Sequence, residues 1–153
     1  MAALLDFNSA NWSYYTIPAA FLLCMVPHAY GIGLAGKNYD LGNPRKTEEH
    51  CAKDTTLNKA TLRRISRAKA AAANGFETIG LYAAAVVAAN AARVPAGRLN
   101  KLTLAYVLSR VVYNYVYVAL QDNARMASVR PFVWMAGIGI IMTLFVSAGK
   151  ALN

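Results

Sequence analysis

Two long stretches of the chain carry no charged side chain, one over residues 7–36 and one over residues 131–149. A bilayer core about 30 Å thick is crossed by about 20 apolar residues in a helix, so each stretch is long enough to span. Asp6 is the only charged residue before the first stretch, whereas a signal peptide begins with basic residues. We therefore predict a retained first span over residues 13–36 and a last span over residues 130–149.

Two further helices are predicted between these spans, over residues 60–91 and 101–121. Residues 93–98 separate them with a proline, a glycine and two arginines, which is typical of a short turn. Each helix holds one ionisable residue within its apolar pattern, Glu77 in the first and Arg110 in the second. Because a charge at membrane depth is costly, we expect both side chains to face the interior of a helix bundle.

Composition supports the same interpretation. Hydrophobic residues make up 57% of the 153 residues and charged residues only 15%, against about 25% charged in a soluble domain. The expected fold is all-α, an integral membrane four-helix bundle formed by a single domain over residues 1–153. The net charge of +9 favours anionic lipid as a partner, and we expect no nucleic acid, since no RNA-binding aromatic motif accompanies the basic residues. The two cysteines lie in no metal-binding or disulfide pattern, so no metal site is expected.

Basic residues predict the orientation. They concentrate in the connection over residues 37–69 and recur at Arg125 and Arg130, whereas the opposite connections carry fewer. The positive-inside rule places the two richer connections in the cytosol. We expect a multi-pass protein of the endoplasmic reticulum if the source is eukaryotic, or of the inner membrane if it is bacterial.

Two features of the first span have plain explanations. Gly31 to Gly36 match the spelling of a dinucleotide-binding loop, but they end a membrane helix and follow no strand. We expect these small residues to let helices approach closely instead. His28 is isolated, which favours a satisfied or interfacial histidine over a ligand.

Polar residues of the two middle helices form two stripes. On the first of these helices the polar residues are spaced i, i+7, i+10, and on the second i, i+3, i+7. Either spacing puts the residues on one face of their helix. The members are Arg67, Asn74 and Glu77 on the first helix, and Arg110, Tyr113 and Tyr117 on the second. A Glu77–Arg110 ion pair across the bundle satisfies both charges, either as a structural pair or as part of a site. If such a pair is buried, replacing either residue by alanine costs about 3–5 kcal/mol.

The ordered set of these residues resembles the MAPEG family, the small four-helix membrane proteins of eicosanoid and glutathione metabolism. The resemblance covers most of the chain and is nearest to bacterial and fungal members. It rests on Asn43-Pro44-Arg45, Arg67-Ala68, Asn74-Gly75-Phe76-Glu77, Arg110 with Tyr113 and Tyr117, and Arg130 before Trp134 and Gly137.

The resemblance implies a homotrimer with active sites between neighbouring subunits, near the cytosolic face, and glutathione as cosubstrate. It implies that Arg130 stabilises the glutathione thiolate, with Arg125 as a rival and Tyr117 as a further catalytic candidate. An apolar electrophile enters this site from the lipid. The residues implied in glutathione binding are Asn74, Glu77, Arg110, Tyr113, Tyr117, Arg67 and Lys37.

Two departures from the family leave the function open. Ala72 stands where many members carry His or Gln, and Ala70 where several carry Arg. The first hypothesis is a glutathione-dependent transferase or peroxidase. The second is a glutathione-independent isomerase or cyclase of an apolar metabolite, with Tyr113, Tyr117, Glu77 or His28 as acid or base. The third is a lipid-binding protein without activity.

Overall fold

The computed structural model describes residues 10–123, 126 and 128–153, and these residues form helices and loops without a strand. The long helices are α1 (Thr16–Ala35), α3 (Lys59–Ala91), α4 (Ala96–Tyr115) and α6 (Val129–Leu152). Short 3₁₀ helices flank α1, namely η2 (Ser13–Tyr15) and η3 (Gly36–Asn38), and η4 (Pro44–Lys46) precedes the short helix α2 (Thr47–Lys53). A π-helical segment, η5 (Val116–Leu120), continues α4.

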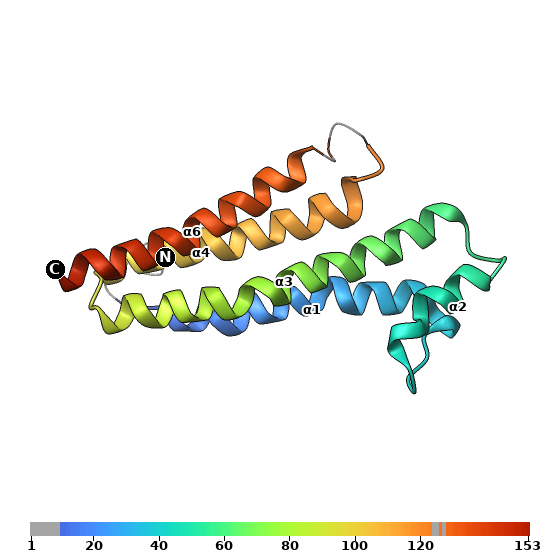
Figure 1. Cartoon of the computed structure of the whole chain (residues 1–153), viewed down its shortest axis with the longest axis horizontal. Helices are drawn as coiled ribbons and strands as arrows, with labels where there is room; N and C mark the ends of the chain where they lie inside the picture. The colour runs from blue at the N-terminus through green and yellow to red at the C-terminus, as the bar shows by residue number, and fades with distance from the viewer. Residues whose placement is uncertain (1–9, 124–125, 127) are drawn as a thin grey trace, which may run out of the picture.

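The long helices lie in two pairs, α1 beside α3 and α4 beside α6 (Figure 1). The pairs diverge toward the end that carries α2, and the C-terminus lies at the opposite end (Figure 1). Tyr82 of α3 and Tyr106 of α4 join the pairs, with stacked rings 3.8 Å apart. Both side chains are fully buried, and around them lies the main apolar core, to which all four long helices contribute.

Among the described residues, three helical segments are long and apolar enough to cross a membrane: Ser13–Asn38, Lys59–Ala91 and Val129–Leu152. The expected span over residues 101–121 corresponds to α4 and η5, and this segment does not meet the same criterion. It also begins earlier than expected, at Ala96, because Pro95 occupies the N-cap position and its carbonyl accepts hydrogen bonds from the N–H groups of Arg98 and Leu99 at 3.0 and 3.1 Å. The turn therefore ends before Gly97 and Arg98, which lie inside α4.

Helices α1 and α3 approach closely where small residues meet. A Cβ atom added to Gly75 of α3 lies 2.8 Å from the Cys24 sulfur of α1, so only glycine fits at this crossing. Gly31 also lies against α3, where an added Cβ atom makes an ordinary contact of 3.4 Å with Cβ of Ala68, whereas an added Cβ atom at Gly33 meets nothing within 4 Å. The prediction of close helix approach is thus confirmed for Gly31.

Asn114 of α4 satisfies a carbonyl group that Pro27 leaves without its helical partner. Proline has no N–H, so Pro27 cannot donate to the Leu23 carbonyl one turn earlier in α1. The Asn114 side-chain amide donates to that carbonyl at 2.8 Å. In a membrane, where water does not compensate a lost hydrogen bond, this contact stabilises the α1–α4 packing.

We expect Asn114→Leu to lower the free energy of unfolding by about 1–3 kcal/mol, because the Leu23 carbonyl then lies buried without a donor. Titration with a denaturing detergent measures this change. In a Pro27→Ala background, the N–H of residue 27 donates to the Leu23 carbonyl. Asn114→Leu is then expected to lower the free energy of unfolding by less. Equal costs in both backgrounds contradict this account.

Candidate functional site

A polar pocket of about 290 Å³ lies between α3, the α4–η5 junction and the start of α6. The start of α6 and the end of α4 lie where the helix pairs diverge (Figure 1). Its lining residues are Asn74, Glu77, Tyr113, Tyr117, Arg130, Pro131 and Trp134. Five of them, Asn74, Glu77, Tyr113, Tyr117 and Arg130, are predicted site residues, and the packing of three helical segments brings these five together.

One wall of the pocket is held by contacts among its own side chains. The Asn74 amide donates a hydrogen bond to the Tyr113 hydroxyl at 2.7 Å. The rings of Tyr113 and Tyr117 meet edge to face with centroids 5.6 Å apart. The Arg130 guanidinium lies over the Tyr117 ring at 4.6 Å, a cation–π distance. These contacts fix the donors and the cation before any ligand arrives.

Glu77 and Arg130 both line the pocket, and each carries a charge. Among the described residues, no ion pair includes the Glu77 carboxylate or the Arg130 guanidinium. Glu77 is exposed in the single chain, and Arg130 is half-buried near the N-terminus of α6. The pocket therefore offers one anion, one cation, an amide and two phenol groups to a ligand that carries charges of both signs.

The predicted Glu77–Arg110 ion pair is wrong. Arg110 is only 4% exposed and lies behind the pocket wall, with its guanidinium over the rings of Tyr106 and Tyr113 at 5.3 and 5.0 Å. It donates to the Val133 carbonyl of α6 at 3.4 Å. The reason is that the guanidinium enters a space beside α6, so its charge is satisfied by ring faces and a carbonyl oxygen.

Two other predicted residues lie outside this pocket. Arg67 donates two hydrogen bonds of 3.0 Å each to the carboxylate of Asp122, beyond the end of η5. Lys37 belongs to η3, is 74% exposed and pairs with Asp54 at 3.5 Å. Both expectations followed from the resemblance, and local acidic partners draw these side chains elsewhere. Arg125 lies outside the described residues.

Pro131 and Trp134 also line the pocket, although neither was predicted as a site residue, and Trp134 was named only as part of the family resemblance. Trp134 follows Arg130 by one helical turn on α6, so the same face of the helix carries both side chains. That spacing is a signal that would have placed Trp134 in the site.

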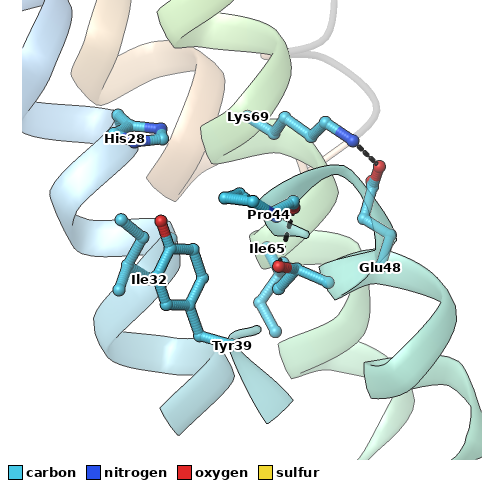
Figure 2. Close-up of a pocket in the computed structure, with 9 residues that line it drawn as sticks. His28, Ile32, Tyr39, Pro44, Glu48, Ile65 and Lys69 are labelled. Carbon is cyan, nitrogen blue, oxygen red and sulfur yellow. Dashed lines mark hydrogen bonds and ion pairs between the residues drawn. The ribbon is translucent and has the colours of Figure 1, made fainter. Parts of the chain in front are cut away.

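A second, smaller cavity of about 80 Å³ lies between α1, α3 and the cap formed by η4 and α2. Figure 2 shows His28 of α1 on one side of it and the Lys69–Glu48 ion pair on the other. That hydrogen bond from Lys69 lowers the pKa of the Glu48 carboxyl below its usual range. His28 therefore lies in a different cavity from Tyr113, Tyr117 and Glu77, which argues against its role as their acid or base.

The MAPEG family model matches residues 14–150, nearly the whole chain. The chain belongs to the MAPEG family. Searches of curated proteins and of solved structures returned no match. MAPEG proteins are membrane proteins of glutathione and eicosanoid metabolism, and members generally use glutathione as a cosubstrate. Among the described residues of this MAPEG protein, no three His, Cys, Asp or Glu side chains form a group suited to a metal ion.

Proposed function

We propose that this MAPEG protein is a membrane-bound, glutathione-dependent transferase or peroxidase that acts on a lipophilic electrophile. The observation that carries the proposal is the pocket in which Glu77 and Arg130 lie without charged partners in the described chain. Glutathione carries an ammonium group, two carboxylates and a thiol, so its charges match this pocket. When bound, it supplies the sulfur nucleophile.

Each pocket residue has a role in this proposal. Glu77 accepts hydrogen bonds from the ammonium group, and Asn74 binds the peptide backbone together with Tyr113. Arg130 lies beside the sulfur and favours its thiolate form, because a nearby cation lowers the pKa of a thiol from about 8.5. Tyr117 holds the guanidinium through its ring and donates from its hydroxyl to the thiolate.

In the transferase reaction, Arg130 stabilises the thiolate while a carbon–sulfur bond forms and the leaving group departs with the electron pair of its bond. In the peroxidase reaction, a lipid hydroperoxide is reduced to an alcohol and water while two glutathione molecules become one disulfide. Trp134 and the surrounding lipid favour an apolar partner in either case, which enters from the membrane.

We also propose a homotrimer. Glu77 is exposed on α3 in the single chain, and its neighbour Phe76 is 40% exposed. An ionisable side chain that faces lipid is costly, whereas one that faces a neighbouring subunit or a bound ligand is not. The polar pocket then lies between subunits. The basic connections favour a position near the cytosolic face, and the proposed membrane is the endoplasmic reticulum or a bacterial inner membrane.

A glutathione-independent isomerase or cyclase is the second candidate, favoured by one observation. Ala70 packs against the cluster that contains Tyr113 and Tyr117, so an apolar methyl group occupies a place beside the pocket wall. A site with fewer polar contacts binds glutathione less tightly and leaves more room for an apolar metabolite. A lipid-binding role without turnover rests on the same feature.

Glutathione binding to the protein in detergent tests the main proposal. We expect calorimetry to detect binding, and ultraviolet difference absorbance to show the thiolate below the pH at which free glutathione ionises. Absence of binding at millimolar glutathione overturns the proposal and favours the isomerase, cyclase or lipid-binding function. S-methyl glutathione, which cannot ionise at sulfur, is the control for the absorbance signal.

We expect Glu77→Gln to weaken glutathione binding about 10- to 100-fold, because a charge-assisted hydrogen bond to the ammonium group is lost. The thermal stability of the protein without ligand is expected to change little, since Glu77 has no ion-pair partner among the described residues. Calorimetry and thermal unfolding measure the two effects. A large loss of stability with unchanged affinity contradicts the assigned role.

A further inference from the structure

A second charged site lies apart from the polar pocket, where three arginines of α3 surround one carboxylate. Arg67 forms two hydrogen bonds of 3.0 Å with Asp122. Arg63 and Arg64 approach the same carboxylate with nitrogen–oxygen distances of 4.0 Å, too long for hydrogen bonds. Three guanidinium groups thus share one carboxylate, which leaves an excess of two positive charges.

The charge excess does not depend on protonation of the acid. Hydrogen bonds from Arg67, together with the charges of Arg63 and Arg64, lower the pKa of the Asp122 carboxyl below its usual range. Asp122 is therefore ionised at neutral pH, and it already neutralises as much positive charge as it can. The cluster of described side chains therefore keeps a net charge of +2 at neutral pH, which attracts a further anion.

The cluster opens into a cavity of about 470 Å³, which shares no lining residue with the polar pocket. Its lining residues are Arg63, Ser66, Arg67, Gln121 and Asp122. Within the described part of the chain, Nε of Arg64, Nε of Arg67 and Nε2 of Gln121 are buried without a hydrogen-bond partner. Unsatisfied buried donors are rare in folded proteins, and here two of the three, on Arg67 and Gln121, belong to residues that line this cavity.

We propose that Arg63, Arg64, Arg67 and Gln121 form a binding site for a phosphate group, carried by an anionic lipid headgroup or by a free phosphate. A planar guanidinium group donates two parallel hydrogen bonds to two phosphate oxygens. A phosphate monoester carries about −1.5 to −2 charges near neutral pH. That charge matches the excess in the cluster. The Ser66 hydroxyl and the Gln121 amide supply further donors at the cavity wall.

The position of the cluster suits a lipid headgroup in particular. Arg63, Arg64 and Arg67 lie in the first turns of α3, before its alanine-rich apolar part. Basic residues at the boundary of a membrane helix are attracted to anionic lipids. A phosphate bound between α3 and Asp122 ties the start of α3 to the segment that follows η5. This site is separate from the glutathione proposal and does not depend on it.

The test uses the full chain in detergent and two probes. Short-chain phosphatidic acid is compared with short-chain phosphatidylcholine, and inorganic phosphate is compared with chloride at equal ionic strength. Thermal unfolding reports stabilisation, and equilibrium dialysis reports bound phosphate. We expect saturable binding of at least one phosphate probe and an unfolding temperature that rises with its concentration.

Three variants and one control make the test specific. Arg63→Gln and Arg64→Gln keep the fold, since these side chains are 69% and 40% exposed, and each is expected to weaken binding about fivefold or more. Asp122→Asn removes the competing internal anion, so it is expected to tighten binding about fivefold. The control is Arg98→Gln. Arg98 is an exposed residue near the start of α4 and does not line the cavity, so binding is expected to stay unchanged.

The outcomes separate the two sources of phosphate. Binding of phosphatidic acid alone assigns the site to a lipid headgroup, and binding of inorganic phosphate assigns it to a free phosphate. Absence of binding by both probes overturns the proposal. Binding that Arg98→Gln weakens as much as Arg63→Gln also overturns it, because the attraction is then only that of a basic surface.

Discussion

Replacing Arg130 by alanine is expected to lower the rate of glutathione conjugation about 10²–10³-fold, the usual cost of removing one group that stabilises a developing or full anion. Arg130 is the cation of the polar pocket and lies over the Tyr117 ring. Without it the thiol of bound glutathione returns toward its ordinary pKa, and the thiolate fraction at neutral pH falls. Ultraviolet absorbance of the bound thiolate as a function of pH measures this shift.

Two further variants test whether the effect comes from the charge of Arg130 and whether it is specific to that arginine. Arg130→Lys keeps the charge but loses the planar contact with Tyr117, so an intermediate rate is expected. Arg125→Ala is the matched arginine control and is expected to leave the thiolate pKa unchanged. If Arg125→Ala raises that pKa and Arg130→Ala does not, the thiolate role belongs to Arg125. Loss of thermal stability in Arg130→Ala indicates a structural role instead.

The second large effect is expected from Gly137→Ala, at about 3 kcal/mol of lost stability. A Cβ atom at Gly137 of α6 lies 2.1 Å from Nη2 of Arg110 and 2.9 Å from its Cζ, which is a severe overlap. The guanidinium is buried between the rings of Tyr106 and Tyr113, so it cannot move to solvent. Either α6 shifts away from α4 or the charge leaves its partners.

Gly139→Ala is the matched control for this prediction. Gly139 lies two positions after Gly137 on α6, and an added Cβ atom there meets nothing within 4 Å. We expect Gly139→Ala to raise the stability by about 0.5–1 kcal/mol, because alanine has a higher helix propensity than glycine and its methyl group meets open space. Unfolding by a denaturing detergent, followed by circular dichroism, compares the two variants. Equal stabilities contradict the proposed contact.

A double variant tests whether the overlap with Arg110 causes the loss of stability in Gly137→Ala. Arg110→Met removes the charge and leaves no carboxylate unpaired, because no described acid forms an ion pair with Arg110. In this background Gly137→Ala is expected to cost much less, since the flexible methionine can move aside. If the two costs add instead, the overlap with Arg110 is not the source of the destabilisation.

Much of the fold follows from the sequence because the pattern of apolar residues is a local property. Uncharged runs longer than about 18 residues have few alternatives to a membrane helix, and α1 and α6 lie where those runs lie. The prediction was poorer for the third helix, whose apolar pattern is interrupted by Arg98, Lys101 and Arg110. There Pro95 decided the start of α4, and the backbone changed to a π-helix at Val116.

Part of the candidate site could likewise be predicted from the sequence, and part depends on how the helices pack. Helical spacing by itself puts Asn74 beside Glu77 and Tyr113 beside Tyr117, because residues three or four apart share a face. That these two faces meet Arg130 and Trp134 in one pocket depends on how α3, η5 and α6 pack. The family resemblance supplied Arg130, which no local pattern marks.

The sequence by itself determined the all-helical membrane character of this MAPEG protein and the faces of its polar helices, since both depend on neighbours along the chain. The tertiary structure alone decided which charge meets which partner. Arg110 turns to ring faces and a carbonyl because Gly137, on a different helix, leaves room for it. Arg67 turns to Asp122 for the same kind of reason, since a carboxylate distant in sequence lies within hydrogen-bond reach. Such choices are made by packing between helices, which no pattern along one helix encodes.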